Sequence, residues 1–382
     1  MAPPKLLFLV TEDWYFCSHR LPVARAARDA GFEVVVAARV RAHGGRIRAE
    51  GFALRRLAWK RRGDGLCGHF RALREIVRLY RSEKPDLLYH VALKPVLFGG
   101  LAARLAFPPR AAPGLLSAVM GLGTGFGSAA AGWRRAILGR ALRCAAAGGT
   151  VIVQNPEDRA ALARLGLAPA RIALIRGSGV DVRYFISLPE PDGPGITVAL
   201  VGRMLRSKGV LDAVAAVRRL RAEGQPVGLL LAGDPDPDSS DSLSEAELME
   251  LAREPGVEWL GHVADVRAVW ARAAVAVLPS SYGEGVPKSL LEAAACGRPI
   301  VASDMPGCRE VVVPGETGLL TPAHDVAALA AAIARLAGDA ALRRQMGEAG
   351  RARIVAEFAE EIVAAQTLAL CRAVIAERDS RR

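Results

Sequence analysis

Short apolar runs alternate with amphipathic stretches along most of this chain, a pattern typical of β–α–β units with parallel strands. In the first half, helical stretches such as Pro22–Ala30 and Phe70–Arg81 lie between the predicted strands. Those strands are Lys5–Val10, Glu33–Ala38, Leu54–Ala58, Asp86–Val91, Leu115–Val119, Thr150–Gln154 and Arg171–Ile175.

A segment rich in Pro and Gly, residues 177–195, separates this half from a second run of the same alternation. The helices expected there include Val210–Ala222 and Ser289–Ala295, and the residues from Asp325 onwards are helical by composition. The second set of predicted strands is Ile196–Val201, Val227–Ala232, Val257–Leu260, Val275–Leu278 and Pro299–Ala302. The sequence therefore predicts two doubly wound α/β domains in tandem, with a ligand cleft between them.

Charge is distributed unevenly along the chain. Residues 1–180 hold 29 Lys and Arg against 11 Asp and Glu, although the whole chain has a net charge of +12. The second half is therefore acidic in balance. Anionic lipid, phosphorylated substrates and nucleic acid could each attract the basic half. A genome rich in Arg codons explains the choice of Arg over Lys, but it does not explain the asymmetry.

Two features bear on the cellular compartment. The six cysteines are scattered, without a C-x-x-C pair or a zinc-like Cys/His cluster, which favours reduced cytoplasmic thiols. Residues 111–133 carry no charge and are long enough to span a bilayer. Six glycines within them favour a buried strand and a Gly-rich loop instead. The apolar run near the start is too short for a signal peptide.

The segment Tyr282–Asp304 contains the strongest motif. Glu284 lies in a Gly-rich loop after a predicted strand, and Glu292 follows eight positions later in the next helix. A strand, a glycine loop and a helix start form an anion-binding corner. Carboxylates beside it accept hydrogen bonds from sugar hydroxyls. The combination suits a ligand with phosphate in the middle and sugars at both ends.

A second motif, Val201–Gly209, follows the first predicted strand of the second half. Its glycine at position 202 precedes Arg203 and Lys208, two cations placed where a diphosphate would lie. A solvated helix start explains this short string equally well when it is taken alone.

Together the two motifs resemble the GT-B glycosyltransferases of family 4, the glycosyltransferase group 1, and the resemblance extends from Lys5 to about Phe358. It implies an α/β GT-B fold with two Rossmann-like domains, and a retaining reaction that needs neither a metal nor another cofactor. Residues 1–185 would bind the acceptor and residues 186–360 the nucleotide sugar. Residues 361–382 would form a C-terminal helix that crosses back to the first domain.

The resemblance also assigns roles to residues of the second half. Glu284 would contact the donor sugar near its reacting carbon, and Glu292 would contact the ribose. The donor diphosphate would be held by side chains and backbone of two loops: Gly202, Arg203, Lys208, Gly285, Val286 and Pro287. Glu284, Arg203 and Lys208 would be catalytic.

Phrases of the first half resemble, more narrowly, the bacterial subset that extends undecaprenyl-diphosphate-linked oligosaccharides. They are Ser18–Pro22, His90-x-x-x-Lys94-Pro95 and Gly121-Leu-Gly123. The implied acceptor-binding residues are His19, Arg20, His90, Lys94 and Gly123. Two departures stand out: the first β–α loop lacks the glycine pair common in the family, and Gly121-Leu-Gly123 replaces a cleft histidine. His90 is therefore expected to take the catalytic polar role, with His19 as second candidate.

These assignments predict a nucleotide sugar (a UDP-sugar favoured), a lipid-linked oligosaccharide and an anionic membrane surface as partners, and no nucleic acid. The protein is expected in the cytoplasm, peripherally on the inner face of the cell membrane. Lys60, Arg61 and Arg62, beside Trp59, are one candidate membrane contact, and the helix at Phe70–Arg81 is another. A UDP-sugar 2-epimerase and a non-catalytic polyanion- or lipid-binding protein remain alternatives.

An acidic run, Asp234-Pro-Asp236-Pro-Asp238, resembles the D-x-D metal site of the other large glycosyltransferase fold. It follows a predicted strand and leads into a Ser-rich acidic loop. We interpret it as a solvated loop at the rim of the donor site rather than a metal site.

Overall fold

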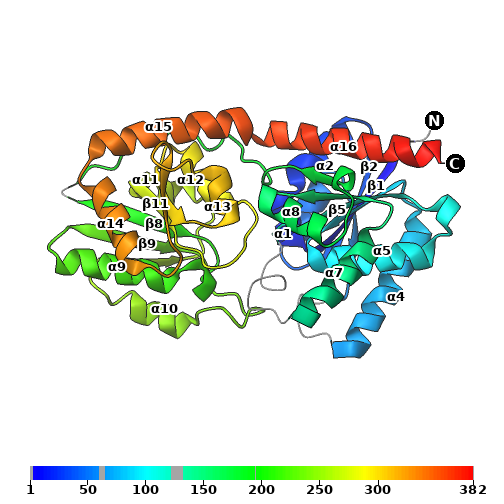
Figure 1. Cartoon of the computed structure of the whole chain (residues 1–382), viewed down its shortest axis with the longest axis horizontal. Helices are drawn as coiled ribbons and strands as arrows, with labels where there is room; N and C mark the ends of the chain where they lie inside the picture. Colours follow the sequence, from blue (N-terminus) through cyan, green and yellow to red (C-terminus); the bar gives the residue numbers. More distant parts are fainter. Residues whose placement is uncertain (1–2, 60–64, 122–131, 194, 382) are drawn as a thin grey trace. The chain divides into compact units, whose positions relative to one another are not determined.

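The computed structural model describes residues 3–59, 65–121, 132–193 and 195–381, and the chain divides into two compact units (Figure 1). Unit 1 comprises Met1–Ser178 together with Glu360–Arg382, and unit 2 comprises Gly179–Ala359. The chain thus passes from unit 1 to unit 2 after Ser178, slightly before the domain boundary at residue 185 that the sequence favours. Each unit holds one parallel sheet with helices on both faces.

Unit 1 is built on seven strands in the order β3-β2-β1-β4-β5-β6-β7. They are β1 (Lys5–Glu12), β2 (Glu33–Arg39), β3 (Ala53–Arg56), β4 (Leu87–Val91), β5 (Gly114–Ala118), β6 (Thr150–Val153) and β7 (Ile172–Leu174). The helices are α1 (Asp13–His19), α2 (Leu21–Asp29), α3 (Gly44–Ala49), α4 (Gly65–Glu83), α5 (Leu93–Ala106), α7 (Gly132–Ala146) and α8 (Pro156–Arg164), with the 3₁₀ turns η1 (Pro109–Ala111) and η2 (Pro169–Arg171). All seven predicted strands are present, displaced by at most a few residues.

The continuous apolar run in β1 is explained by cover on both faces of the sheet. Leu6 and Phe8 belong to the core on one face, and Leu7 and Leu9 to the core on the other. Successive strand residues point to opposite faces, so a strand buried on both sides needs no polar alternation.

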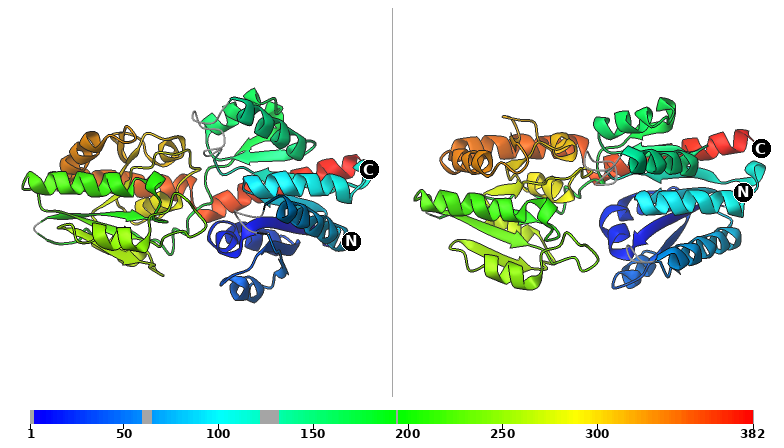
Figure 2. Two further views of the ribbon diagram at one scale, coloured as in Figure 1. Left: turned by 90° about the horizontal axis from the view of Figure 1, so that it is seen from below. Right: turned by 60° about the horizontal axis from the view of Figure 1, so that its bottom comes forward.

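The last helix, α16 (Glu360–Ser380), completes unit 1 although it follows unit 2 in the chain. Its residues Val363, Ala364, Cys371 and Val374 are buried in the same core as Leu6 and Phe8. Figures 1 and 2 show this red helix alongside the blue helix α2. The C-terminal helix therefore contributes to the core of unit 1.

Unit 2 is built on six strands in the order β10-β9-β8-β11-β12-β13. They are β8 (Ile196–Val201), β9 (Val227–Ala232), β10 (Val257–Gly261), β11 (Val275–Leu278), β12 (Ile300–Ser303) and β13 (Gly318–Thr321). Its helices are η3 (Arg206–Lys208), α9 (Val210–Ala222), α10 (Glu245–Leu251), α11 (Arg267–Arg272), α12 (Lys288–Ala295), α13 (Pro306–Val311), α14 (Val326–Ala337) and α15 (Ala340–Glu357). The sixth strand, β13, was not predicted.

The uncharged segment at residues 111–133 includes β5, a largely buried inner strand of the unit 1 sheet. Among the residues that the structure describes, no helix is long and apolar enough to cross a membrane.

Candidate functional site

The strand order of unit 2 changes direction between β8 and β11, so the loops that follow these two strands diverge from one point. Open α/β sheets bind their ligands at the carboxyl ends of strands at such a switch point. The Ser281 amide donates a hydrogen bond to the Ser207 carbonyl at 2.8 Å and joins the two loops. Gly209 has φ +74°, and a Cβ there would lie 2.1 Å from the Pro279 carbonyl oxygen. Only glycine therefore allows the loops to approach this closely.

A buried ion pair lies where these loops meet. The Lys208 Nζ donates to the Glu284 Oε2 at 2.6 Å, and the Ser280 hydroxyl donates to the other carboxylate oxygen at 2.7 Å. The two charged side chains are only 11% and 12% exposed. Burial alone lowers the pKa of Lys208, but Glu284 and Tyr282 together more than offset this and raise the pKa above its usual value. Lys208 therefore remains a cation at neutral pH.

Arg203 is held by a second carboxylate. Its guanidinium pairs with Asp236, which is only 7% exposed, and the Asp236 amide donates to the Ser242 hydroxyl at 2.8 Å. The interpretation of residues 234–238 as a solvated loop is wrong for Asp236, because this side chain is buried against Arg203. Over the described parts of the chain, no group of three or more His, Cys, Asp or Glu residues is placed to hold a metal ion.

The loop from Glu284 to Pro287 leads directly into α12. Gly285, Val286 and Pro287 are buried, and Pro287 is the N-cap residue of the helix. Gly307, at the start of α13, packs directly against this loop. A Cβ at position 307 would lie 2.0 Å from the Gly285 carbonyl oxygen, so no larger residue fits there. The helix dipole is positive at this end of α12. The arrangement is suited to an anion beside Glu284.

Glu292 lies on α12 and is largely buried. Burial raises its pKa to about 7, while the Lys288 ammonium, 3.9 Å away, acts in the opposite direction. Near neutral pH this carboxyl group is present in both protonation states, so it can accept or donate a hydrogen bond to a hydroxyl group.

His90 is fully buried in β4, and this contradicts the prediction that it is catalytic and contacts the acceptor. Its Nε2 lies 2.8 Å from the Tyr80 hydroxyl of α4. A Cβ at Gly99 of α5 would lie 2.6 Å from the same nitrogen. Burial lowers the pKa of His90 to about 3, so the ring is neutral and enclosed.

The remaining residues assigned to the acceptor do not form one cluster. Arg20 is 2% exposed, contacts the Met120 sulfur and stacks on Tyr89, so its burial also argues against direct acceptor contact. Tyr89 belongs to the core on the face opposite to Tyr80, the partner of His90. The structure therefore separates Arg20 from His90.

Two further assignments rest on aromatic contacts in unit 1. The Lys94 ammonium lies 5.5 Å from the centroid of the Trp59 ring, on the same side of the sheet as Tyr80. His19 stacks on Tyr15 with ring centroids 4.2 Å apart. Gly123 lies outside the described residues, as do Lys60, Arg61 and Arg62.

Two known family models match this chain in succession. Residues 5–155 match the model described as "Glycosyl transferase 4-like", and residues 195–339 match "Glycosyl transferases group 1". The first match lies within unit 1 and the second within unit 2. Their junction coincides with the linker between the two halves of the sequence.

Curated relatives resemble this chain over about half of its length. The chain is 36% identical to alpha-maltose-1-phosphate synthase of Mycolicibacterium smegmatis over 55% of this chain and 59% of that protein. It is 29% identical to the capsular polysaccharide biosynthesis glycosyltransferase CapM of Staphylococcus aureus over 44% of this chain and 43% of that one. The matches thus span about half the length of these relatives.

Solved structures confirm the fold over nearly the whole chain. HepE of Anabaena, in complex with UDP and glucose, is 19% identical and covers 95% of this chain and 98% of its own, with a TM-score of 0.77. Sucrose-phosphate synthase of Thermosynechococcus elongatus is 25% identical and covers 98% and 100%, with a TM-score of 0.79. The predicted GT-B fold is therefore confirmed.

Proposed function

We propose that this protein transfers a sugar from a nucleotide sugar, a UDP-sugar favoured, to a saccharide or lipid-linked acceptor with retention of the anomeric configuration. The observation that carries the proposal is the buried Lys208–Glu284 pair at the switch point of unit 2, beside the start of α12. It places a cation and a carboxylate beside the amino-terminal end of a helix, where the helix dipole is positive, and this set suits a sugar diphosphate. The fold shared with HepE, which was solved with UDP, supports the choice of nucleotide.

The three parts of the donor, its diphosphate, its ribose and its sugar, are expected to contact different residues of unit 2. Its diphosphate would contact the Lys208 ammonium and the first amides of α12, and Arg203, oriented by Asp236, would contact it from the neighbouring loop. The ribose hydroxyls would bind Glu292, eight residues beyond Glu284 in the sequence. The sugar would then lie beside Glu284.

In the proposed reaction the bond between the anomeric carbon and the diphosphate oxygen breaks while the acceptor hydroxyl forms a bond to that carbon on the same face. The hydroxyl proton moves to the departing diphosphate, which leaves as a nucleoside diphosphate. Lys208 and Arg203 stabilise the negative charge that develops on the leaving group, so the step needs no metal. Glu284 holds a sugar hydroxyl and offsets positive charge at the anomeric carbon.

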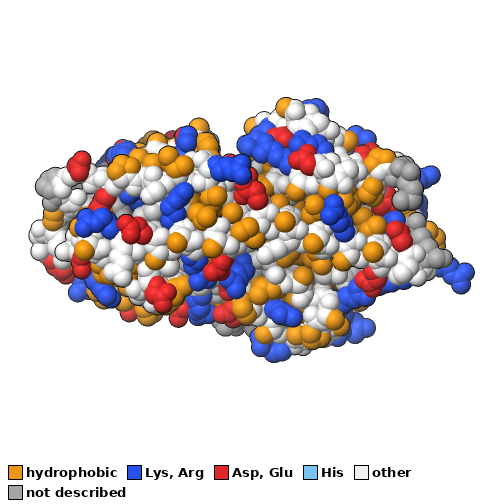
Figure 3. Space-filling view, turned by 90° about the horizontal axis from the view of Figure 1, so that it is seen from above, with side chains coloured by type: hydrophobic (Ala, Val, Ile, Leu, Met, Phe, Trp, Pro, Cys, Tyr) orange, Lys and Arg blue, Asp and Glu red, His pale blue; other side chains and the backbone are white. Residues whose placement is uncertain are grey.

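A lipid-linked acceptor would require docking on the cytoplasmic face of an anionic membrane, and α4 offers a suitable surface. Its Ala72, Ile76 and Tyr80 are buried in the core of unit 1. On its outer side Phe70 is 64% exposed, and four arginines are also exposed: Arg71, Arg74, Arg78 and Arg81. On another face of the molecule, Figure 3 shows hydrophobic side chains exposed among Lys and Arg over unit 1. Each basic residue near an anionic membrane adds about 1 kcal/mol to binding.

The experiment that tests the activity is a donor screen with saccharide acceptors and a bacterial lipid extract, in which release of nucleoside diphosphate is followed. The anomeric configuration of the product is then determined by NMR. We expect release that depends on the acceptor and a product with the configuration of the donor. An inverted product would exclude the proposed reaction, and epimerisation of UDP-GlcNAc without acceptor would indicate the 2-epimerase instead.

A further inference from the structure

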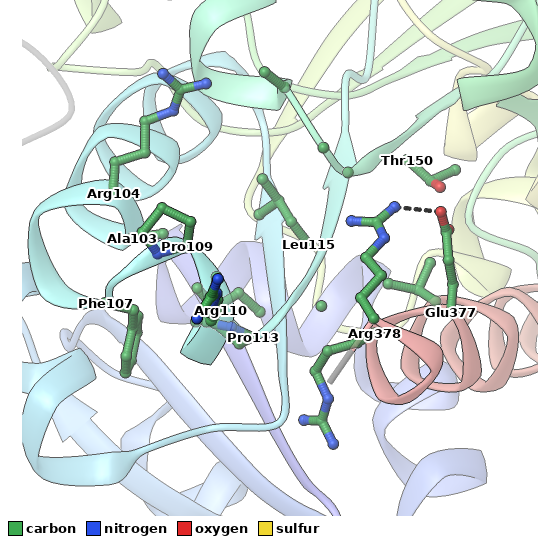
Figure 4. Close-up of a pocket in the computed structure, with 18 of the residues that line it drawn as sticks. Ala103, Arg104, Phe107, Pro109, Arg110, Pro113, Leu115, Thr150, Glu377 and Arg378 are labelled. Carbon is green, nitrogen blue, oxygen red and sulfur yellow. Dashed lines mark hydrogen bonds and ion pairs between the residues drawn. The ribbon is translucent and has the colours of Figure 1, made fainter.

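A cavity of about 360 Å³ lies at the amino-terminal edge of the unit 1 sheet (Figure 4). The first residues of β4, β5 and β6 line its floor. Figure 4 shows Arg104, Phe107 and Arg110 on one side of it, and Glu377 and Arg378 of α16 on the other. Because the candidate donor site belongs to unit 2, this cavity is a separate feature of the molecule.

Arginine dominates the polar lining of the cavity. Five arginines and one carboxylate line it: Arg104, Arg110, Arg171, Arg378, Arg381 and Glu377. The local sequence has the same bias, because no Asp or Glu occurs between Asp86 and Glu157. The positive charge therefore comes from several elements that converge on one cavity: α5, η1, η2 and the end of α16.

The carboxylates nearby do not balance these cations. Arg171 and Arg381 share the single carboxylate of Glu377. Arg378 pairs with Asp86 at 2.7 Å and with Asp379 at 2.6 Å.

The other two arginines remain uncompensated. Neither Arg104 nor Arg110 forms an ion pair with any described residue. Both side chains are exposed, so they can turn toward an anion at low cost. The cavity thus has a surplus of guanidinium groups.

We propose that this cavity binds a phosphate-bearing organic anion. Guanidinium groups match phosphate oxygens in a bidentate arrangement, and two of them have no carboxylate to displace. Phe107, Pro109, Pro113 and Val374 provide an apolar wall for the remainder of the ligand. The volume lies at the small end of ligand pockets, which suits a phosphorylated metabolite or a phospholipid headgroup and is too small for nucleic acid.

Such a ligand would connect two parts of unit 1 that are far apart in the sequence. Arg104 and Arg110 flank the end of α5, whereas Arg378 and Arg381 belong to the end of the chain. Binding would therefore fix the last turns of α16, the helix that returns from unit 2 to unit 1. This inference does not depend on the proposed transferase activity.

The test follows amide hydrogen exchange of the full chain, with inorganic pyrophosphate as the soluble probe and vesicles of phosphatidylcholine with or without phosphatidic acid as the lipid probe. Ionic strength is kept constant with chloride. We expect one of the probes to slow exchange over Val374–Ser380. In R104Q/R110Q the probe concentration for half-maximal protection should rise at least about tenfold, the factor for loss of one charge-assisted hydrogen bond. Protection by pyrophosphate indicates a soluble ligand, and protection only by acidic vesicles indicates a lipid headgroup.

The double variant R140Q/R164Q is the matched control, because it removes the same charge from exposed positions of α7 and α8 that do not line the cavity. It should respond to the probe like the wild type. The proposal is overturned if neither probe protects α16, or if both double variants lose protection equally. Protection confined to residues 203–209 would show that the probe binds unit 2 and would likewise refute it. If Arg104 and Arg110 serve only to stabilise the nearby helix ends, R104Q/R110Q should unfold more easily than the wild type, and neither probe should slow amide exchange in α16.

Discussion

Replacement of Lys208 by Met separates the structural role of the buried pair from its role in donor binding. Loss of one partner leaves the Glu284 carboxylate buried without its cation, which costs about 3–5 kcal/mol in a fully buried pair. Ser280 still donates to this carboxylate, and the two side chains are 11% and 12% exposed. We therefore expect the lower end, about 3 kcal/mol, or a fall in Tm of roughly 6–12 °C for a domain of this size.

The same substitution should weaken UDP binding. A hydrogen bond to a charged group contributes about 1.5–3 kcal/mol, so the Kd for UDP should rise about 10- to 150-fold. Uridine lacks the diphosphate and should bind with nearly unchanged affinity. Thermal unfolding without ligand measures the fall in Tm, and isothermal titration measures the Kd values for UDP and for uridine.

The double variant K208M/E284Q is the control, because it removes the uncompensated charge as well. Its Tm should recover toward the wild-type value, whereas its affinity for UDP should stay low. If the affinity for UDP recovers together with the Tm, Lys208 acts through stability alone. A Kd for UDP within twofold of wild type in K208M would refute the assignment of Lys208 to the diphosphate.

Four further outcomes are expected. E284Q should lower turnover about 100-fold, the scale for one preorganised electrostatic contact, and near-normal turnover in a folded variant would show that Glu284 is misassigned. Arg203→Ala should weaken binding of UDP more than that of uridine, and equal losses in titration would indicate structural damage. Because burial raises the pKa of Glu292 to about 7, its stabilising contribution is present in acid and lost as pH rises through that value. Between pH 5 and pH 8 the free energy of unfolding of the wild type, measured with urea, should therefore fall by at most about 3 kcal/mol relative to that of Glu292→Gln. A difference between the two proteins that does not change with pH would contradict this. R71Q/R74Q should release the protein from acidic liposomes in sedimentation without affecting UDP binding, and unchanged sedimentation would remove α4 from the membrane contact.

The sequence predicts the inner strands of both sheets well because strands such as β1 and β8 are continuous apolar runs buried on two faces. The edge strands β3 and β10 are more polar and partly exposed. β13 escaped prediction because its residues Gly318–Thr321 form a short run with two partly exposed positions. It was recognisable only as the strand that pairs with β12 at the edge of the sheet.

The sequence predicted the site residues of unit 2 better than those of unit 1. Lys208 and Glu284 were singled out by motif, but their ion pair joins positions far apart in the sequence and depends on the loop contact at Gly209. His90 was misassigned because a polar residue near the end of a strand resembles a site residue, while only packing shows that Tyr80 and α5 enclose it. Asp236 was misjudged for the opposite reason, since an acidic run gives no sign of which carboxylate is buried.

A crystal structure of the protein with UDP would decide whether unit 2 holds the nucleotide as proposed. The diphosphate should lie against the Lys208 ammonium and the first amides of α12, with the ribose hydroxyls on Glu292. UDP bound elsewhere, with the Lys208–Glu284 corner vacant, would contradict the account.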